Sequence, residues 1–220
     1  MKRRVMAVCG MLACGLASAD AKFEQLSVRI EQNATDQDFE FVVEATGGDT
    51  GFAALTVRAP DGRVVARFEA PKSGLGMRTF RLETPEPKSF ARLQADYPAG
   101  DYTFTATTVT QLQLSDTARL SHQLPAAATF VRPRPHESGV APGGLRIEWR
   151  PPAGLKSCVL TIENDVTEVK VVQATLAGTA STFQVPDKLL EAGATYKIAI
   201  GSVAQNGNAS YVETLFSVAK

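Results

Sequence analysis

Cysteine is scarce in this chain of 220 residues, which contains Cys9, Cys14 and Cys158. The first two lie in an N-terminal segment that we interpret below as a cleaved leader, so the mature chain keeps one cysteine. One cysteine excludes an intramolecular disulfide, so each domain must be held together by its hydrophobic core. Cys158 alternates in phase with Leu160 and Ile162, which predicts a buried thiol rather than a reactive one.

Histidine is equally scarce, since the chain has only His122 and His136. A Ser-His-acid triad needs a histidine oriented by a carboxylate, and the sequence contains no Gly-x-Ser-x-Gly nucleophile elbow. Two histidines 14 positions apart and one cysteine do not have the spacing of zinc ligands. We therefore expect two solvated surface histidines, no catalytic residues, no metal site and no cofactor.

Long apolar runs are absent except at the N-terminus. Three cations at positions 2–4 precede an uncharged apolar run over residues 5–16, and the small residues 17–19 follow. This order is typical of a secretory signal peptide and predicts cleavage after Ala19, with Ala21 as the competing site. No later stretch reaches 18 apolar residues, so we expect no transmembrane anchor.

The leader also bears on lipidation and on the net charge of the mature chain. Residues 11–14, Met-Leu-Ala-Cys, loosely resemble a lipoprotein cleavage box, so lipidation of Cys14 is the alternative to a free mature chain. Removing residues 1–19 takes away three of the 23 basic residues and leaves 20 against 23 acidic ones. Because no basic stripe is present, we expect no nucleic-acid partner and no attraction to anionic lipid.

Alternation of apolar and polar residues, typical of strands, dominates the rest of the chain. In the block 20–125, we expect strands over residues 22–32, 38–45, 52–59, 63–70, 77–85, 101–112 and 115–125. Helical spacing occurs once, where Ser89 caps a short helix that places Phe90 and Leu93 on one face. Proline and glycine then crowd the stretch from 124 to 145, so we place the domain boundary near Ala126.

The second block, 126–220, predicts a proline-broken edge strand over Thr129–Arg132. Further strands are expected over residues 145–149, 158–163, 167–176 and 182–186, then around Tyr196 and over 209–219. Asn206-Gly207 is a two-residue hairpin signal. Several short strands at regular spacing are typical of an antiparallel β-sandwich.

Residues 127–220 resemble a fibronectin type III domain. The resemblance rests on Trp149 with its trailing prolines ("LRIEWRPP"), on "TFQVPDKLLEAGATYKIAIGSV", and on "NGNAS" before the last strand. Leu190, Gly193 and Tyr196 match the family's pattern before the penultimate strand. This implies that the Tyr196 ring packs inside while its hydroxyl meets a backbone group. The third strand departs from the family, since Cys158 stands where a tyrosine is usual.

The chain repeats that pattern, because "YPAGDYTFTATTV" at 97–109 is similar to "LEAGATYKIAIGSV" at 190–203. We therefore predict an all-β protein with two tandem immunoglobulin-like or fibronectin type III-like β-sandwiches after a cleaved signal peptide. The predicted parts are 1–19, 20–125 and 126–220. The arrangement resembles small exported bacterial proteins, which implies an envelope location and no particular activity.

Several polar clusters have both a chemical and a structural interpretation. The oxygen-rich stretch from Asn33 to Glu40 offers ligands that calcium prefers, but a polar hairpin turn is the favoured interpretation. Asp96 and Asp101 flank a turn, where capping is favoured over glycoside hydrolysis. Asn33-Ala34-Thr35 and Asn208-Ala209-Ser210 are formal N-glycosylation acceptors.

These observations favour a non-enzymatic binding or spacer protein of the bacterial envelope that contacts a protein or glycan. The alternative is a periplasmic chaperone-like assembly subunit that uses the groove between the domains. Such a subunit would grip a carboxylate with basic residues, and Arg132, Arg134 and Arg150 near the linker are the candidates. An enzyme is the third and least favoured hypothesis.

Overall fold

The computed structural model describes residues 22–71 and 74–220. The predicted signal peptide, its cleavage after Ala19 and the lipidation of Cys14 lie outside the described residues. The one α-helix within these residues, α1 (Phe90–Asp96), has seven residues, which is too short to cross a bilayer. Strands account for nearly all the remaining regular structure, as the alternation predicts.

The first sandwich consists of two antiparallel layers. One layer has the order β1-β2-β5, with β1 (Gln25–Asn33), β2 (Asp38–Thr46) and β5 (Thr79–Glu83). The other has the order β4-β3-β6-β7, with β3 (Phe52–Arg58), β4 (Val64–Glu69), β6 (Gly100–Thr108) and β7 (Gln113–Leu120). All seven strands were predicted from the alternation, and each predicted range overlaps the observed one.

The second sandwich has the layers of a fibronectin type III-like fold. Its smaller sheet has the order β13-β10-β8, with β8 (Thr129–Arg132), β10 (Arg146–Arg150) and β13 (Thr182–Gln184). Its larger sheet has the order β12-β11-β14-β15, with β11 (Ser157–Asn164), β12 (Lys170–Ala177), β14 (Thr195–Val203) and β15 (Ala209–Val218). The predicted edge strand β8 does lie at a sheet edge. The sequence analysis missed β9 (Glu137–Val140), which pairs in parallel with the end of β15.

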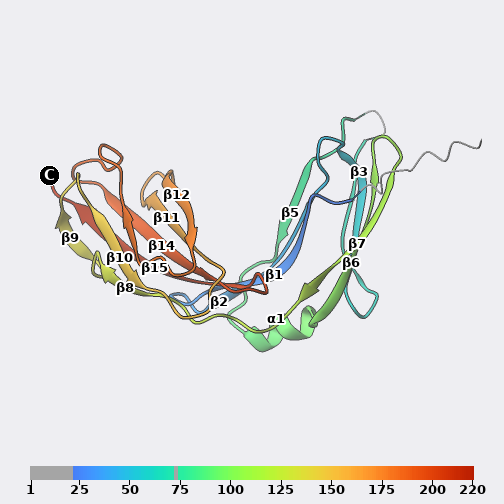
Figure 1. Cartoon of the computed structure of the whole chain (residues 1–220), viewed down its shortest axis with the longest axis horizontal. Coiled ribbons are helices and arrows are strands. Elements are labelled where there is room, and N and C mark those ends of the chain that lie inside the picture. Colours follow the sequence, from blue (N-terminus) through green and yellow to red (C-terminus); the bar gives the residue numbers. More distant parts are fainter. Residues whose placement is uncertain (1–21, 72–73) are drawn as a thin grey trace, which may run out of the picture.

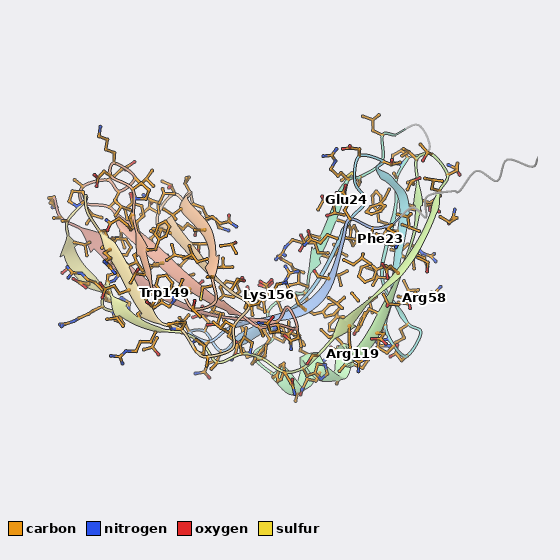
Figure 2. The ribbon with its side chains drawn as sticks, viewed as in Figure 1. Phe23, Glu24, Arg58, Arg119, Trp149 and Lys156 are labelled. Carbon is orange, nitrogen blue, oxygen red and sulfur yellow. The ribbon has the colours of Figure 1, made fainter. Side chains whose placement is uncertain are left out.

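Each sandwich encloses its own hydrophobic core. Buried side chains between residues 23 and 120 form one cluster, and those between 128 and 218 form the other. Figure 2 places Phe23 in the first sandwich and Trp149 in the second. Burial of alternate residues of facing sheets is the main stabilising term of such a fold.

The repeated sequence pattern corresponds to a repeated tyrosine latch. The buried Tyr102 hydroxyl donates a hydrogen bond to the Pro98 carbonyl oxygen at 3.1 Å. The buried Tyr196 hydroxyl accepts one from the Glu191 backbone N–H at 2.9 Å. In both sandwiches a tyrosine at the start of a central strand thus fastens the turn just before it. The prediction of a backbone partner for Tyr196 is confirmed.

The helix α1 has the predicted cap and packs against the first sandwich. The Ser89 hydroxyl accepts a hydrogen bond from the Arg92 N–H at 3.2 Å. Leu93 is buried, and the Phe90 ring stacks on Phe39 of β2 with ring centroids 4.8 Å apart. The helix therefore closes the end of the first sandwich nearest the linker (Figure 1).

The two sandwiches share one sheet, which the sequence analysis did not predict. The end of β1 pairs in parallel with the start of β15, with Glu31 opposite Ala209 and Asn33 opposite Tyr211. This pairing joins the β1 layer and the β15 layer into an eight-stranded sheet. Figure 1 shows the result as an open V, with β1, β2 and β5 in one arm and β11, β12 and β14 in the other.

Asn208 lies at the vertex of the V and its side chain is fully buried. Its Oδ1 accepts a hydrogen bond from the Ile30 N–H at 2.9 Å. Its Nδ2 donates to the carbonyl oxygens of Ser121 and Gln123 at 2.7 and 2.9 Å. One amide therefore connects β1, the linker and the start of β15. The Ser210 hydroxyl adds a bond to the Pro125 carbonyl oxygen at 2.7 Å.

Replacing Asn208 by Ala removes the side-chain partner of the Ile30 N–H and of the Ser121 carbonyl oxygen, while the Gln123 carbonyl oxygen keeps a hydrogen bond from Asn206 Nδ2 at 3.0 Å. We expect Asn208→Ala to lower the free energy of unfolding by about 2–4 kcal/mol, because each unpaired buried group costs about 1–3 kcal/mol. Small-angle scattering should also show a wider range of angles between the arms. The matched control is Gln205→Ala in the same turn, since its one side-chain bond is a long contact of 3.5 Å at an exposed position. Equal urea midpoints and equal scattering for both variants would contradict the role of Asn208.

The tyrosine latches give a second test. Tyr102→Phe and Tyr196→Phe each remove one hydrogen bond and keep the ring, so each should cost about 1 kcal/mol in the free energy of unfolding. Urea unfolding followed by tryptophan fluorescence reports on the second sandwich, because Trp149 is the only tryptophan. Circular dichroism reports on both sandwiches. A free energy unchanged in either variant would show that its hydroxyl is dispensable.

Candidate ligand cleft between the two sandwiches

The three arginines predicted to line the domain junction lie elsewhere. Arg132 is on β8 and Arg150 ends β10, both in the small sheet of the second sandwich, and Arg134 follows β8. All three are exposed, and Glu148 opposes Arg132 in the sheet register. None of them lines the cleft described below. The predicted partner site at these arginines stays a prediction.

The concave face of the shared sheet forms a cleft of about 690 Å³. Its walls come from both sandwiches, with β1, β2 and β5 on one side and β11, β12, β14 and β15 on the other. The cleft exists because β1 and β15 pair at the vertex, so the solvent faces of the two layers turn toward each other (Figure 1).

Strand alternation decides which side chains line this cleft. On β1, Val28 and Ile30 are buried in the core, so Arg29 and Glu31 point to the opposite face. The same alternation brings Lys197 and Ala199 of β14 to the cleft, while Ile198 packs in the core of the second sandwich. Position in a strand, rather than nearness to the linker in sequence, therefore selects the lining.

Acidic side chains outnumber basic ones in the lining by seven to four. The acidic residues are Glu31, Asp38, Glu40, Glu83, Glu86, Glu163 and Glu213, and the basic residues are Arg29, Arg81, Lys170 and Lys197. A concave surface with an excess of one charge focuses the electrostatic potential. The cleft therefore favours cations over anions.

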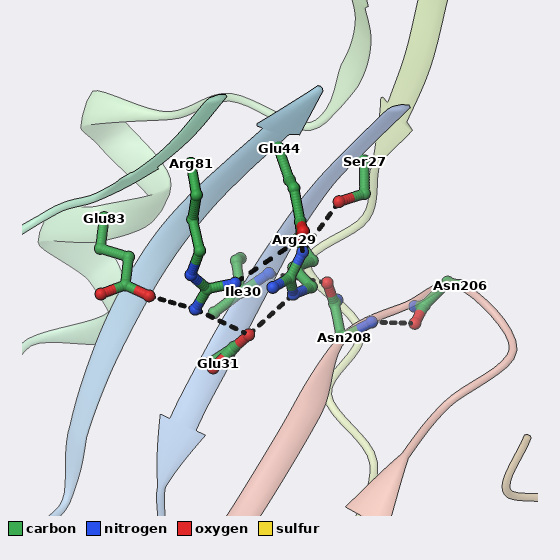
Figure 3. Close-up of polar contacts among 9 residues, drawn as sticks. All are labelled: Ser27, Arg29, Ile30, Glu31, Glu44, Arg81, Glu83, Asn206 and Asn208. Carbon is green, nitrogen blue, oxygen red and sulfur yellow. Dashed lines mark hydrogen bonds and ion pairs between the residues drawn. The ribbon is translucent and has the colours of Figure 1, made fainter. Parts of the chain in front are cut away.

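The two arginines of the cleft are held by glutamates (Figure 3). Arg29 Nε lies 2.7 Å from Glu31 Oε1, and another guanidinium nitrogen of Arg29 lies 3.0 Å from Glu44 Oε2. Arg81 lies 3.8 Å from Glu31 and 3.6 Å from Glu44, and it pairs with Glu83. These guanidinium groups already have carboxylate partners, so the groove offers no free arginine pair to grip a carboxylate.

Burial and the acidic excess together raise the pKa of Glu40. Burial, a hydrogen bond with the Glu86 carboxyl, and repulsion from Glu83 and Glu31 raise the pKa of Glu40 from 4.5 to about 7. Burial also raises the pKa of Glu213 on the opposite arm. A cation bound in the cleft would lower both pKa values by stabilising the carboxylates.

Tyr211 is the aromatic residue of the cleft. Its ring lies on Gly201 of β14, where an added Cβ would stand 2.4 Å from a ring carbon. Glycine at position 201 therefore lets the ring rest flat against the sheet. Burial first, and the nearby carboxylate of Glu31 second, raise the pKa of Tyr211 to about 12.

Neither histidine lines this cleft, and the two differ from each other. His122 is half-buried, its Nε2 lies 2.8 Å from the Tyr97 carbonyl oxygen, and its ring meets the edge of Phe90. The expectation of a solvated histidine is therefore wrong for His122, because its ring fastens α1 to the chain after β7. His136 is exposed, as expected.

The remaining candidates have structural roles. Asn33 Oδ1 accepts hydrogen bonds from the N–H groups of Thr35 and Asp36, which confirms the hairpin turn between β1 and β2. Asp96 pairs with Arg92 at 2.6 Å, and Asp101 pairs with Arg119 at 3.1 Å. Each of these aspartates therefore has an arginine as its ion-pair partner.

Cys158 is fully buried as predicted, and burial raises the pKa of its thiol. The acceptor interpretation of Asn208 is wrong, because its amide nitrogen is buried and donates two hydrogen bonds. Within residues 22–71 and 74–220, no three His, Cys, Asp or Glu side chains are grouped as metal ligands.

The pKa of Glu40 predicts how stability changes with pH. The folded value of about 7 lies above the ordinary 4.5, so the folded state favours the protonated carboxyl. The stabilisation from this group is present below pH 4.5 and is lost as the pH rises through about 7. Glu40→Gln keeps the uncharged form, so we expect it to raise the melting temperature at pH 8 and to leave it unchanged at pH 4. Since Glu40 is partly exposed, the gain at pH 8 should be about 1 kcal/mol or less, or roughly 2–4 °C.

The matched control for this pH test is Glu69→Gln, which removes the same charge from the exposed end of β4 outside the cleft. Thermal unfolding of both variants and of the natural chain between pH 4 and pH 8 gives the comparison. A gain at pH 8 that is equal in the two variants would reflect net charge alone and would contradict the local origin.

No family model and no curated protein matches this chain. A segment of two fibronectin type III domains from chicken tenascin is 15% identical, with a match that covers 89% of this chain and 99% of that one at a TM-score of 0.34. Fibronectin(III)-like modules of CbhA from Clostridium thermocellum are 9% identical, with 90% and 93% of the two chains covered and a TM-score of 0.34. Sandwich folds of this kind serve many functions, so the likeness says nothing about what this chain binds.

Proposed function

We propose that this chain is an exported, non-enzymatic binding or spacer protein of the bacterial envelope whose binding surface is the cleft between its two sandwiches. The observation that carries the proposal is the cleft of about 690 Å³ on one continuous sheet. Its volume is within the range of ordinary ligand sites, roughly 300–1,000 Å³. Both arms contribute to it, so a bound partner would contact the two sandwiches at once.

The fixed vertex supports a binding role for this groove. The Asn208 hydrogen bonds and the β1–β15 pairing hold the arms at one angle before any partner arrives. A preorganised site avoids the cost of ordering on binding. A spacer joined by a loose linker would need neither the buried amide nor the shared sheet.

The groove also favours the second candidate, a periplasmic chaperone-like assembly subunit. The two candidates differ in the chemistry expected at the groove. Arg29 and Arg81 are the arginines present, and both are paired with glutamates. The assembly subunit therefore has a groove of the right kind but lacks free basic groups for a carboxylate, which is why the binding or spacer role is favoured.

A capture experiment with sterically altered chains tests the proposal. Thr175 of β12 lines the cleft and is exposed, so Thr175→Trp places a bulky ring in the groove without changing its charge. The control removes the three exposed arginines outside the cleft, as Arg132→Ala, Arg134→Ala and Arg150→Ala in one chain. Each full chain is crosslinked in the native cell, and its partners are identified by mass spectrometry.

We expect the natural chain and the arginine variant to capture the same dominant partner, and Thr175→Trp to lose it. Loss of that partner in the arginine variant alone would overturn the proposal that the cleft is the binding surface. It would favour the surface that carries the three arginines. Retention in both variants would place the contact at a loop or a strand edge and would also overturn it. Binding to cell-wall or surface glycan that Thr175→Trp abolishes would support the cleft and identify a carbohydrate partner.

A further inference from the structure

The seven carboxylates of the cleft differ in their ion-pair partners, and Asp38 pairs with Lys88 at 3.0 Å. Glu31, Glu83 and Glu163 lie within 4 Å of a basic side chain of the cleft. Glu40, Glu86 and Glu213 also line the cleft, but within the described residues no basic nitrogen lies within 4 Å of them. These three carboxylates therefore have no ion-pair partner within 4 Å, although the charge of Lys197 acts on Glu213 from farther away.

These three carboxylates come from both arms of the V. Glu40 is on β2 and Glu86 follows β5, so both belong to the first sandwich, while Glu213 is on β15 of the second. Tyr211 is opposite Asn33 of β1 in the register of the shared sheet, and Glu213 two residues later lines the same cleft. Tyr211 therefore lies where the two arms meet.

The position of Tyr211 suits a cationic ligand. One side of its ring rests on Gly201, and the ring lines the cleft. An ammonium or guanidinium group over an aromatic face is attracted by the ring quadrupole, and the attraction is stronger when the site is desolvated. Carboxylates on either side of such a ring add charge-assisted hydrogen bonds to the same cation.

The sheet edges indicate a polypeptide rather than a small cation. β5 and β12 are the terminal strands of the eight-stranded sheet, and both contribute side chains to the cleft. Within residues 22–71 and 74–220, each of these two strands pairs with another strand along one edge only, so its other edge can pair with an added extended chain. A cleft of about 690 Å³ is also larger than one lysine or arginine side chain fills.

We propose that the cleft recognises an extended segment of a partner polypeptide through its lysine or arginine side chains, which Glu40, Glu86 and Glu213 bind around the ring of Tyr211. The inference rests on the proposed function, since it names the chemistry of the partner for the same cleft. It commits to a cationic protein segment and not to a glycan.

Binding should strengthen as the pH rises through about 7, because Glu40 becomes fully charged only above its pKa. The groups that face Glu40 are Glu31, Glu83 and Glu86, with Tyr211, Arg29 and Arg81 farther into the same charge network. A bound cation and a proton compete for this network, so each weakens the binding of the other.

The test uses the full chain and an eight-residue fluorescent peptide in which lysine and threonine alternate. A peptide of alternating glutamate and threonine serves as the negative probe. Fluorescence anisotropy at pH 8 and moderate salt measures the dissociation constants for the natural chain. The triple variant Glu40→Gln, Glu86→Gln and Glu213→Gln removes the three carboxylates, and Glu69→Gln, Asp116→Asn and Glu148→Gln removes three outside the cleft as the matched control.

We expect the lysine peptide to bind and the glutamate peptide not to bind. The cleft variant should weaken binding at least tenfold and the matched control less than about twofold, since long-range charge is screened by salt. For the natural chain, binding at pH 5.5 should be several-fold weaker than at pH 8. Glu40→Gln is expected to stabilise the fold at pH 8, so a melting temperature measured alongside shows that lost binding is not lost folding.

Equal weakening by the two triple variants would mean that net charge alone attracts the peptide, and it would overturn the proposal. Absence of lysine-peptide binding would overturn it as well. If Thr175→Trp abolishes the capture of a native partner while the lysine peptide does not bind, the proposed function stands and this inference fails. If neither a partner nor the peptide depends on the cleft, both fail.

Discussion

The structure depends on one buried amide. Asn208 bonds to the Ile30 backbone in the first sandwich and to the carbonyl oxygens of Ser121 and Gln123 in the linker. All partners of its side-chain amide are backbone groups. The amide therefore requires a particular backbone geometry around it and no particular neighbouring side chain. In a buried site such bonds are strong and their loss is costly, because no water replaces them. The angle between the sandwiches, and hence the cleft, follows from this constraint.

A shared sheet has consequences for its edges as well as for the cleft. The outer edge of β15 is covered by β1 at its start and by β9 at its end, which removes an edge that would otherwise pair with another chain. Along the main path of this sheet, as far as the described residues show, the terminal strands are β5 and β12, which flank the concave face. The same pairing that protects one edge therefore places the edges of β5 and β12 beside the charged surface. Carboxylates held there against their mutual repulsion lower stability, which is a common property of binding sites.

Most of the fold was predictable from local signals in the sequence. Alternation located the strands, Ser89 marked the start of α1, and proline near Thr129–Arg132 marked an edge strand. The junction was not predictable, because the parallel pairing of Glu31–Asn33 with Ala209–Tyr211 involves three residues and leaves no periodic pattern. Asn208 was interpreted within its own tripeptide, although its partners are 85 to 178 residues away. The arginines near the linker were chosen by nearness in sequence, whereas strand alternation and sheet register decide which charges face the groove.

The tyrosine latches and the Asn208 amide have different kinds of role. The latches belong to the fold of each sandwich, whereas the amide belongs to the junction between them. Tyr102 and Tyr196 solve the same problem twice, and each acts within its own sandwich. Such a repeat is expected wherever this fold occurs, so it identifies the fold and not the activity. Asn208 has no counterpart in the first sandwich, since it acts between the domains. The features that distinguish this chain from a plain pair of sandwiches are therefore those at the vertex: the amide, the shared sheet, and the charged concave face that they create. A function specific to this chain is best sought there, because neither sandwich alone contains that surface.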